Sequence, residues 1–245
     1  MSNSNNKCNS SQQIEFLKSL PTTRLRAICS LIAKHEIIAD IGADHGKVSE
    51  FIYKNSLAKK LIVNDISSPS LAKAKSLLAL NSVNDRENAQ NATGIVFQAI
   101  CGSRLHELEP QINCAVIAGM GGDEIVKIVS NLQCETLVLS PQTKAEIVRN
   151  KLNQMSYNIF VDAVIKEKNK FYDVILAKKN DGKNKAASKS LSKEEEFSGK
   201  FYRFKNPNLL EKLRKEEQKI LKYKDLKKDY KNKLSVIEKA MQWQL

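Results

Sequence analysis

Cysteine is scarce in this sequence, and its few positions show no pattern of a disulfide framework or a zinc site. The five cysteines are odd in number and widely separated, with no C-x-x-C pair (Cys8, Cys29, Cys101, Cys114 and Cys134). Disulfide-rich secreted domains and zinc modules carry paired, closely spaced cysteines. We therefore expect free or buried thiols, a reducing cytoplasm and no metal centre.

Long apolar runs are also missing. No stretch approaches the roughly 20 apolar residues that a membrane-spanning helix needs, although 42% of the residues are hydrophobic. Residues 1–13 are rich in Asn and Ser and lack the apolar segment of a secretory signal. These absences predict a soluble chain with no membrane partner, which begins with a flexible tail over residues 1–20.

Acidic residues are too few to balance the basic ones, and the 245-residue chain has a formal net charge of +13. The excess is uneven, because residues 181–245 carry 18 basic and 10 acidic side chains. Such a segment attracts a polyanion, for example a nucleic acid. A solvated charged helix is the alternative that charge alone leaves open. The chain length fits two unequal domains.

Short runs rich in Ile and Val alternate with helical segments over the first two-thirds of the chain. The runs that predict buried strands are Ile37–Ile41, Leu61–Val63, Ile95–Ile100, Ala115–Ala118 and Leu137–Leu139. Helical patterns lie near residues 25–32 and over Lys47–Leu57, Pro69–Leu80, Asp123–Val129 and Lys144–Met155. This alternation predicts a parallel sheet with right-handed crossovers. Two later runs, residues 158–166 and 171–177, are too close for a crossover and predict an antiparallel hairpin.

The last part of the chain changes in character. Residues 181–199 lack apolar periodicity, which predicts a linker between a first domain over residues 21–180 and a second over residues 200–245. Asn206-Pro207 supplies an N-cap and a proline for a first helical turn. Apolar residues then recur at heptad positions: Leu209, Leu213, Ile220, Tyr223, Tyr230, Leu234, Ile237 and Met241. We expect a coiled-coil hairpin that turns within residues 222–229, or one long helix packed on a partner.

The motif Asp40-Ile41-Gly42-Ala43-Asp44-His45-Gly46 follows the first predicted strand. Gly42 permits a tight turn and a close approach of the backbone to a ligand. Asp65 lies about 20 residues downstream, after the second strand, where an acidic side chain can accept hydrogen bonds from both ribose hydroxyls. The combination points to a cofactor that contains adenosine. A helix-capping role for Asp65 and a purely structural loop role for His45 are the alternatives.

The charge of this loop separates two classes of cofactor. The full G-x-G-x-x-G fingerprint is absent, and Asp40 and Asp44 occupy the loop that surrounds a pyrophosphate in dinucleotide sites. Carboxylates repel phosphate, but they attract the cationic sulfonium and amino groups of S-adenosylmethionine. The loop therefore favours S-adenosylmethionine over a nicotinamide dinucleotide.

A second glycine-rich motif, Ile117-Ala118-Gly119-Met120-Gly121-Gly122, ends the fourth predicted strand. Ligands of open α/β sheets bind at the carboxyl ends of the strands, and glycines let the backbone pass beneath a flat base there. Core packing of Met120, and placement of Asp123 and Glu124 at a helix N-terminus, are the structural alternatives.

Together with Leu137-Val138-Leu139-Ser140-Pro141-Gln142 and Phe171-Tyr172-Asp173-Val174-Ile175, these motifs resemble the bacterial tRNA (adenine-N1)-methyltransferase family called TrmK. The resemblance implies an α/β fold, a Rossmann-like class I methyltransferase sheet with a C-terminal helical coiled-coil domain. It also implies methylation of N1 of adenosine 22 in the tRNA D-arm. Gly102-Ser103-Arg104 stands where the family usually has Gly-Asp-Gly, and Ser140-Pro141-Gln142 where it has Gln-Pro-Asn.

The motifs and the resemblance together predict the residues of a site for S-adenosylmethionine and tRNA. Expected cofactor contacts are Asp40, Gly42, Asp44, His45, Gly46, Asp65, Ile66, Gly102, Ser103, Ala118, Gly119 and Met120. Expected substrate contacts are Arg24, Gly121, Gly122, Tyr172, Arg203, Lys205, Arg214 and Lys222. Asp44 and Asp123 are the candidates for a catalytic carboxylate, and a monomer is expected.

Adenine N1 is a nucleophilic lone pair, so positioning and electrostatics can carry methyl transfer without a strong general base. N1 lies on the Watson–Crick edge, so a paired adenine must first be flipped out. The Asn/Asp-Pro-Pro-aromatic motif of exocyclic-amine methyltransferases is absent after the fourth strand. Two rival functions are an inactive Rossmann and coiled-coil RNA-binding module, and a methyltransferase for another nucleic acid or a small molecule.

Overall fold

The computed structural model describes most of the chain, namely residues 13–84, 94–98, 112–180, 190–222 and 228–245. Gly102 and Ser103, which were predicted to contact the cofactor, lie outside the described residues, as do residues 1–12 of the predicted tail. Within the described ranges no helix is long and apolar enough to cross a bilayer. The same ranges contain no group of three His, Cys, Asp or Glu side chains that could hold a metal ion.

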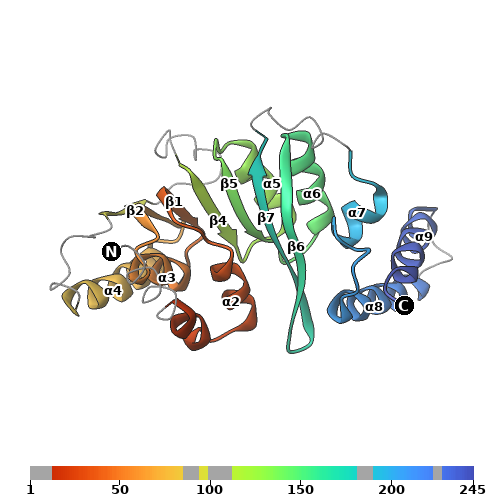
Figure 1. The fold of residues 1–245 in the computed structure, drawn as a ribbon, viewed down its shortest axis with the longest axis horizontal. Helices are drawn as coiled ribbons and strands as arrows, with labels where there is room; N and C mark the ends of the chain where they lie inside the picture. Colours follow the sequence, from red (N-terminus) through yellow and green to blue (C-terminus); the bar gives the residue numbers. More distant parts are fainter. Residues whose placement is uncertain (1–12, 85–93, 99–111, 181–189, 223–227) are drawn as a thin grey trace, which may run out of the picture.

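Seven strands form one sheet in the described part of the chain (Figure 1). They are β1 His35–Ile41, β2 Ala58–Asn64, β3 Gly94–Gln98, β4 Cys114–Ala118, β5 Thr136–Ser140, β6 Tyr157–Glu167 and β7 Lys170–Lys179. Their order is β3-β2-β1-β4-β5-β7-β6, with β1 to β5 parallel and β7 antiparallel to both neighbours. The predicted strands and hairpin are confirmed, except that residues 99–100 lie outside the described part. The carboxyl ends of the parallel strands therefore share one edge of the sheet.

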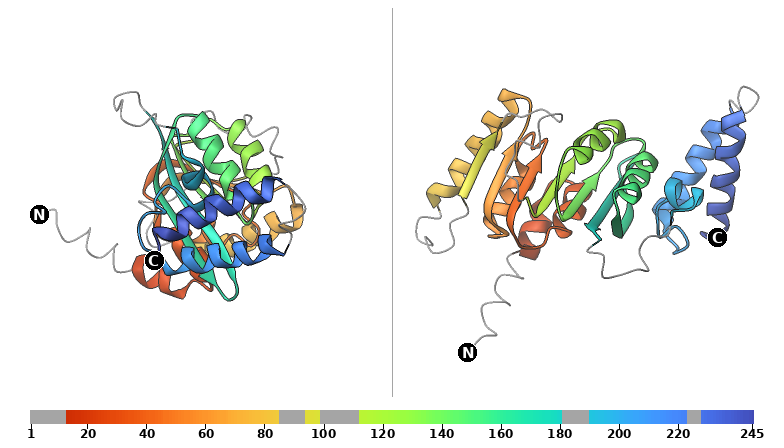
Figure 2. Two further views of the ribbon diagram at one scale, coloured as in Figure 1. Left: turned by 90° about the vertical axis from the view of Figure 1, so that its right-hand side faces the viewer. Right: turned by 90° about the horizontal axis from the view of Figure 1, so that it is seen from above.

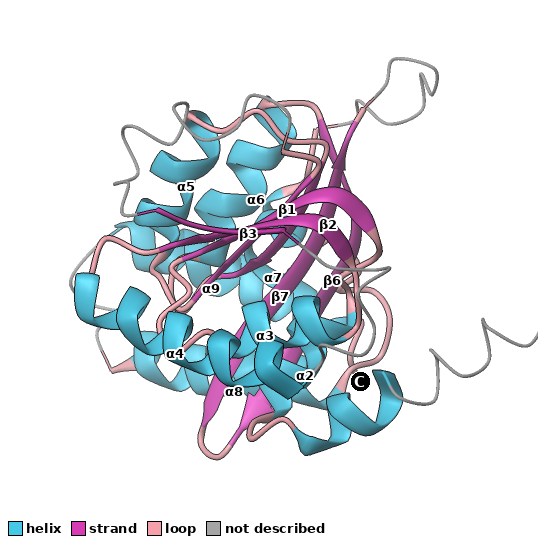
Figure 3. Ribbon diagram, turned by 90° about the vertical axis from the view of Figure 1, so that its left-hand side faces the viewer, coloured by secondary structure: helices cyan, strands magenta, loops and turns pink. Residues whose placement is uncertain are grey.

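Helices cover both faces of the sheet, because alternate strand residues are apolar on both sides. Residues such as Ala39 and Ile117 pack with α5 Gly122–Ser130 and α6 Ala145–Gln154 on one face. Residues such as Ile38 and Val116 pack on the other face with α2 Thr23–Ser30, α3 Lys47–Lys54 and α4 Ser68–Asn84. Figure 3 shows these two helical layers above and below the sheet. The burial of both faces matches the near-continuous apolar runs in the sequence.

The hairpin of β6 and β7 is longer than the parallel strands and extends beyond their carboxyl edge. Leu139 in β5 pairs with Ile175, so residues 170–174 of β7 continue past the last paired residue of β5. In Figure 1 the tip of the hairpin projects downward, with α2 on one side and α8 on the other. The hairpin therefore separates the sheet edge from the C-terminal helices.

Three helices follow the sheet: α7 Lys193–Ser198, α8 Pro207–Leu221 and α9 Lys228–Gln242. Figure 2 shows α8 and α9 together at one end of the molecule, beyond β6. They contact each other, and their apolar residues pack with Val164 of β6 in a third core cluster. Because α8 ends at Leu221, one continuous helix is excluded. Residues 223–227 of the predicted turn lie outside the described part.

Two short helices lie where the sequence predicts irregular chain. Residues 13–19 are helical within the predicted flexible tail, and Phe16 packs against Phe51 at a ring distance of 5.7 Å. Within the predicted linker, Ser192 caps α7 through a capping box with Glu195. The structure therefore differs from the expectation in both places, because local packing and capping order segments without apolar periodicity.

A buried arginine ties the C-terminal segment to the sheet. The guanidinium of Arg149 in α6 is fully buried, donates to both carboxylate oxygens of Asp162 at 2.8 Å, and donates to Asp173 at 2.5 Å. It also donates to the carbonyl oxygen of Glu196 in α7, at 3.1 Å. The second oxygen of Asp173 accepts from Lys212 of α8 at 2.6 Å. One network thus connects α6, β6, β7, α7 and α8.

Candidate active site

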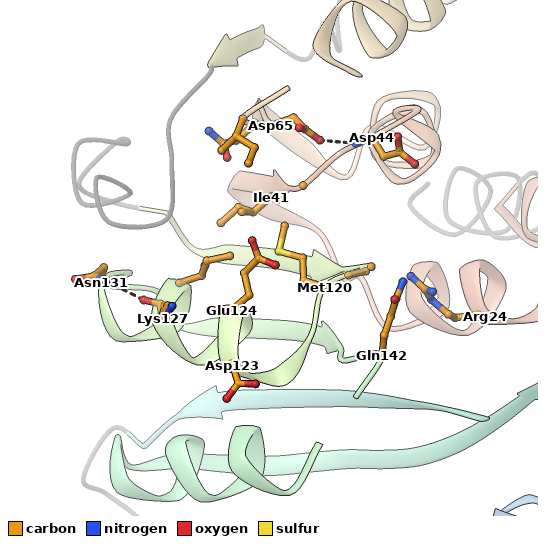
Figure 4. A pocket seen from close by; sticks show the side chains of 16 residues that line it. Arg24, Ile41, Asp44, Asp65, Met120, Asp123, Glu124, Lys127, Asn131 and Gln142 are labelled. Carbon is orange, nitrogen blue, oxygen red and sulfur yellow. Dashed lines mark hydrogen bonds between the residues drawn. The ribbon is translucent and has the colours of Figure 1, made fainter. Parts of the chain in front are cut away.

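A cavity of about 990 Å³ opens at the carboxyl edge of the parallel strands. Its lining comes from the ends of β1, β2, β4 and β5, from one face of α5, and from Arg24 of α2. Figure 4 shows Asp44 and Asp65 on one side and Asp123 on the other, with Arg24 and Gln142 together at one end. We call this hollow the edge cavity. Its place is where open α/β sheets bind ligands.

The loop after β1 is held to the loop after β2 by backbone and carboxylate hydrogen bonds. Gly42 has a φ of 76°, which glycine adopts without strain, and its N–H donates to the carbonyl oxygen of Asn64 at 2.8 Å. The N–H of Asp44 donates to Oδ2 of Asp65 at 3.0 Å, while Oδ1 of Asp65 accepts from the N–H of Ser67 at 2.8 Å. Asp65 therefore shapes both loops and still faces the cavity.

The glycine-rich loop after β4 packs closely on its neighbours. A Cβ on Gly42 would lie 2.1 Å from Cε of Met120, so the methionine covers the first loop. The backbone of Met120 is fixed because its carbonyl oxygen accepts from the N–H of Gln142 at 2.9 Å. A Cβ on Gly122 would lie 2.4 Å from the carbonyl oxygen of Lys144. Gly122 is therefore explained by close backbone packing.

The edge cavity is acidic. Four carboxylates line it, from Asp44, Asp65, Asp123 and Glu124, against the two cationic side chains of Arg24 and Lys127. Asp123 forms an ion pair with Lys144 at 2.6 Å. Because both side chains are exposed, solvent screens this pair, and Lys144 only partly neutralises the negative charge of Asp123. A cavity with this charge attracts a cation and repels a free phosphate.

Asp40 lies beneath the first loop and is buried rather than part of the cavity lining. Its Oδ2 accepts from the hydroxyl of Ser49 at 2.5 Å. Burial raises the pKa of Asp40 against the opposing hydrogen bonds from Ser49, and with a smaller contribution from the nearby Asp65 the pKa is about 6. A positive ligand near this loop would favour the ionised form.

Arg24 reaches the end of the cavity from α2. Its guanidinium lies 4.8 Å from the centre of the Tyr172 ring, and its backbone N–H donates to Glu167 at 3.1 Å. Its Nε is buried and has no hydrogen-bond partner among the described residues. A Cβ added to Gly119 would lie 3.7 Å from the guanidinium of Arg24. Helix α2, the β6–β7 hairpin and the loop after β4 therefore meet at Arg24.

The structure brings together a subset of the residues that the sequence predicts. Those that line the edge cavity are Arg24, Gly42, Asp44, Asp65, Ile66, Ala118, Gly119, Met120 and Asp123. Those that lie in the surrounding loops or strands without lining it are Asp40, His45, Gly46, Gly121, Gly122 and Tyr172. Those on the C-terminal segment, away from the cavity, are Arg203, Lys205, Arg214 and Lys222.

Arg203 and Lys205 already have intramolecular contacts. The guanidinium of Arg203 lies over the rings of Tyr202 and Trp243, at 5.6 and 5.1 Å. The ammonium of Lys205 donates to the carbonyl oxygen of Leu245 at 2.8 Å. Both side chains therefore help to hold the chain end against the start of α8.

Several lining residues were not predicted. Asn64 ends β2 and Gln142 follows β5, while Glu124 and Lys127 belong to α5 and Asn131 is its C-cap. The spacing of three or four residues along α5 places these polar side chains on one face. That spacing alone did not indicate a site, because an amphipathic helix normally keeps polar residues on its solvent face.

Residues 21–175 match the protein family described as "Methyltransferase domain". The chain belongs to this family. The β-sheet of the methyltransferase is the Rossmann-like sheet of class I, with the edge cavity at its ligand-binding edge. The methyltransferase is 24% identical over 163 residues to the tRNA (adenine(22)-N(1))-methyltransferase of Bacillus subtilis strain 168, a match that covers 64% of this chain and 65% of that protein.

The methyltransferase is also similar to solved structures along most of its length. One is TrmK of M. capricolum in complex with S-adenosyl-homocysteine, with a TM-score of 0.77, 20% identity, and coverage of 91% of this chain and 99% of that one. Another is the B. subtilis m1A22 tRNA methyltransferase TrmK, with a TM-score of 0.67, 22% identity, and coverage of 92% and 97%. These structures share the fold of this chain beyond the sheet.

Proposed function

We propose that the methyltransferase transfers a methyl group from S-adenosylmethionine to N1 of an adenosine in tRNA, at position 22 of the D-arm. The observation that carries the proposal is the acidic edge cavity, bounded by the two glycine-rich loops, in a chain similar to a B. subtilis enzyme named for this reaction. The proposal includes a monomer in the cytoplasm with tRNA as its partner.

The residues of the edge cavity fit the cofactor. Each carboxylate oxygen of Asp65 accepts one backbone hydrogen bond, and a carboxylate oxygen has a further lone pair for a ribose hydroxyl. The excess of carboxylates suits a sulfonium and an ammonium group. Gly42 and Met120 border the space on one side, while Glu124, Lys127 and Asn131 border it on the other.

The cofactor supplies an electrophilic methyl group on a cationic sulfur. The chain must hold adenine N1 in line with that methyl group and exclude water. In the loop after β4, Gly119 and Gly121 leave the backbone bare on either side of Met120, so that a flat base can approach it closely. Asp44 and Asp123 are proposed to accept hydrogen bonds from the adenine amino group as positive charge develops on the base. Asp44 is the better placed of the two, because Lys144 already engages Asp123.

The C-terminal segment, residues 200–245, is proposed to be a coiled-coil domain that binds tRNA. The support is the contact between α8 and α9, the apolar heptad residues in their shared core, and the positive charge of the segment. Phosphate contacts in this segment can offset the cost of flipping the target base, a few kcal/mol. Arg214 and Lys222 are exposed on α8 and at its end, and both remain candidates for such contacts.

The decisive experiment is identification of the methylated nucleoside. We expect purified protein, labelled S-adenosylmethionine and unmodified tRNA to yield 1-methyladenosine, and a transcript with guanosine at position 22 to yield none. Another methylated nucleoside would contradict the proposed site. Absence of product despite cofactor binding would favour the inactive RNA-binding module.

The Asp65→Ala variant tests the cofactor half of the same proposal. Loss of its charge-assisted hydrogen bonds should weaken S-adenosylmethionine binding by roughly 1.5–3 kcal/mol in titration calorimetry. The matched control is Glu36→Ala, an exposed carboxylate on β1 whose side chain pairs with Lys59 at 2.8 Å, outside the cavity. Unchanged affinity in a folded Asp65→Ala protein would leave this aspartate a loop-shaping role only.

A further inference from the structure

A second hollow, of about 620 Å³, lies between the loop after β5, the tip of the β6–β7 hairpin and the C-terminal helices. We call it the lysine groove. Six lysines line it: Lys144, Lys170, Lys212, Lys215, Lys219 and Lys233. Lys212 is held in the buried network through Asp173, whereas Lys144, Lys215, Lys219 and Lys233 form partly exposed ion pairs with Asp123, Glu211 and Glu216.

The groove and the edge cavity have opposite charge. Six lysines line the groove against the three carboxylates of Glu146, Asp173 and Glu216, whereas carboxylates outnumber cations in the cavity. A cationic cofactor is therefore attracted to the cavity and a polyanion to the groove. Because tRNA must bring its target base to the cavity, the adjacent basic groove is the favourable place for its backbone.

Aromatic rings lie among the lysines. Phe171 and Tyr172 of β7 line the groove, and the ammonium of Lys215 lies 4.9 Å from the centre of the Phe171 ring. Lys233 of α9 lies 4.8 Å from the centre of the Phe197 ring. Alternation of cationic and aromatic side chains is typical of sites that bind single-stranded nucleic acid, where bases stack and phosphates pair with cations.

The two hollows meet at the Arg24 and Tyr172 pair. Gln142 lines both hollows, Arg24 lines the cavity, and Tyr172, against which Arg24 stacks, lines the groove. The buried Nε of Arg24 has no partner within the described residues. Arg24 as a whole is partly exposed, so a phosphate at this junction can pair with its guanidinium, and a shift of the side chain would bring Nε to the same acceptor.

We propose that the lysine groove holds the RNA strand next to the target nucleotide, in single-stranded form, and that Arg24 binds the phosphate of that nucleotide at the junction. The inference rests on the proposed function for the identity of the polyanion. It assigns the strand path to the inner side of α8, facing the hairpin, and not to the outer residues Arg214 and Lys222.

The test compares two triple variants with equal loss of charge. The groove variant is Lys170→Gln, Lys215→Gln and Lys219→Gln, and the control is Lys34→Gln, Lys59→Gln and Lys193→Gln, whose lysines lie outside both hollows and outside α8 and α9. The groove variant should bind tRNA on the order of 100-fold more weakly at 0.15 M salt, with a salt slope smaller by somewhat under three. The control should keep the affinity and slope of the wild type, and both should bind S-adenosylmethionine normally.

Crosslinking then locates the strand. Full-length tRNA with 4-thiouridine beside the target nucleotide should crosslink to the peptide that contains Phe171 and Tyr172. Crosslinks to Arg214 or Lys222 instead, or equal loss of affinity in both triple variants, would overturn the inference. These readouts measure RNA binding, so they are independent of which nucleoside is methylated. If the product proved not to be 1-methyladenosine, the proposed function would fail while the strand path could still be confirmed or rejected.

The role of Arg24 has its own readout. The Arg24→Gln variant should raise the KM for tRNA at least tenfold and leave the dissociation constant of S-adenosylmethionine unchanged. Weaker cofactor binding would show that Arg24 binds the carboxylate of the cofactor instead and would overturn its assignment to the nucleotide phosphate. Crosslinking of this variant keeps the strand path testable whichever result is found.

Discussion

Asp40 lies in β1 and Asp65 follows the neighbouring strand β2, and the two differ in what surrounds them. Asp65 lines the cavity and accepts two backbone hydrogen bonds. Asp40 is buried beneath the loop and receives its hydrogen bonds from Ser49, so burial dominates and raises its pKa to about 6. One aspartate is therefore available to a ligand, while the other responds to the charge that a ligand brings.

This difference predicts a pH-dependent stability. A carboxyl group with a pKa of 3.8 in the unfolded chain and about 6 in the fold stabilises the fold fully below pH 3.8. That contribution is lost as the pH rises through 6. The Asp40→Asn variant lacks the effect, so its stability relative to the wild type should rise by roughly 2 kcal/mol between pH 4 and pH 7.5. Urea unfolding at both values measures this, and an unchanged difference would contradict the assigned pKa.

The sequence predicts the residues that follow strands better than those on helices. Gly42, Asp65 and Gly119 were found because a ligand edge is defined by strand ends, and strands are visible as apolar runs. Lys127 of α5 was missed because a polar helical residue normally faces solvent. The groove residue Lys215 was missed because its place depends on how α8 packs against the hairpin, which no local pattern encodes.

At the scale of elements, one buried ion pair adds to the apolar packing that attaches α8 to the hairpin. Burial would raise the pKa of Asp173, but Lys212 and Arg149 outweigh it and lower the pKa to about 2. The side chain of Lys212 is 19% exposed and that of Asp173 is 7% exposed, so the pair is screened little by solvent. The pair holds α8, which carries three of the six lysines of the groove, against β7.

The Lys212→Met variant should therefore lower the free energy of unfolding by roughly 2 kcal/mol at pH 7, less than for an orphaned buried charge because Arg149 remains. Asp173 has a depressed pKa, so its contribution is present above pH 3.8 and is lost as the pH falls towards 2. The cost of the substitution should accordingly shrink below pH 4. Lys239→Met, at an exposed pair with Glu194, is the control and should cost under about 1 kcal/mol in the same urea experiment. Equal costs would contradict the anchoring role.

The order of strands and helices could be predicted from the sequence, but the contacts that hold the C-terminal elements to the sheet could not. Apolar runs gave the strands, and the four residues between the last two runs required a hairpin. The helix α7 has a capping box at Ser192 and Glu195, which is a legible signal, but the segment is too short for helical periodicity to appear. The buried Arg149 resembles any charged residue of an amphipathic helix until its partners from β6 and β7 are placed around it.

At the scale of the whole molecule, the edge cavity and the lysine groove are built from largely different parts of the chain. The residues of the edge cavity all lie between Arg24 and Gln142, while the lysine groove adds residues from the hairpin, α8 and α9. On the proposed function, cofactor binding should therefore depend on the sheet and its loops. RNA binding should depend on how the C-terminal helices are docked beside the hairpin.

This separation predicts the result of truncation, provided that the boundary respects the buried network. A chain that ends at Lys200 keeps α7, whose carbonyl oxygens accept from Arg149, and keeps the N–H of Lys200 that donates to Asp162 at 2.8 Å. Circular dichroism should show that this chain is folded. It should bind S-adenosylmethionine with nearly the affinity of the full chain. Its kcat/KM for tRNA should fall by more than about tenfold, because the lysines of α8 and α9 are gone.

A chain that ends at Ser192 is the informative comparison. It loses α7 as well, so Arg149 keeps its carboxylates but loses its carbonyl acceptors, and Asp162 loses the N–H of Lys200. The surface of β6 that faced α8 and α9 is exposed in both truncated chains. This chain should unfold at lower urea concentration than the chain that ends at Lys200, since buried donors without acceptors cost about 1–3 kcal/mol each. Unchanged methylation of tRNA by the folded Lys200 chain would show that α8 and α9 serve another purpose, because the sheet alone would then hold the RNA.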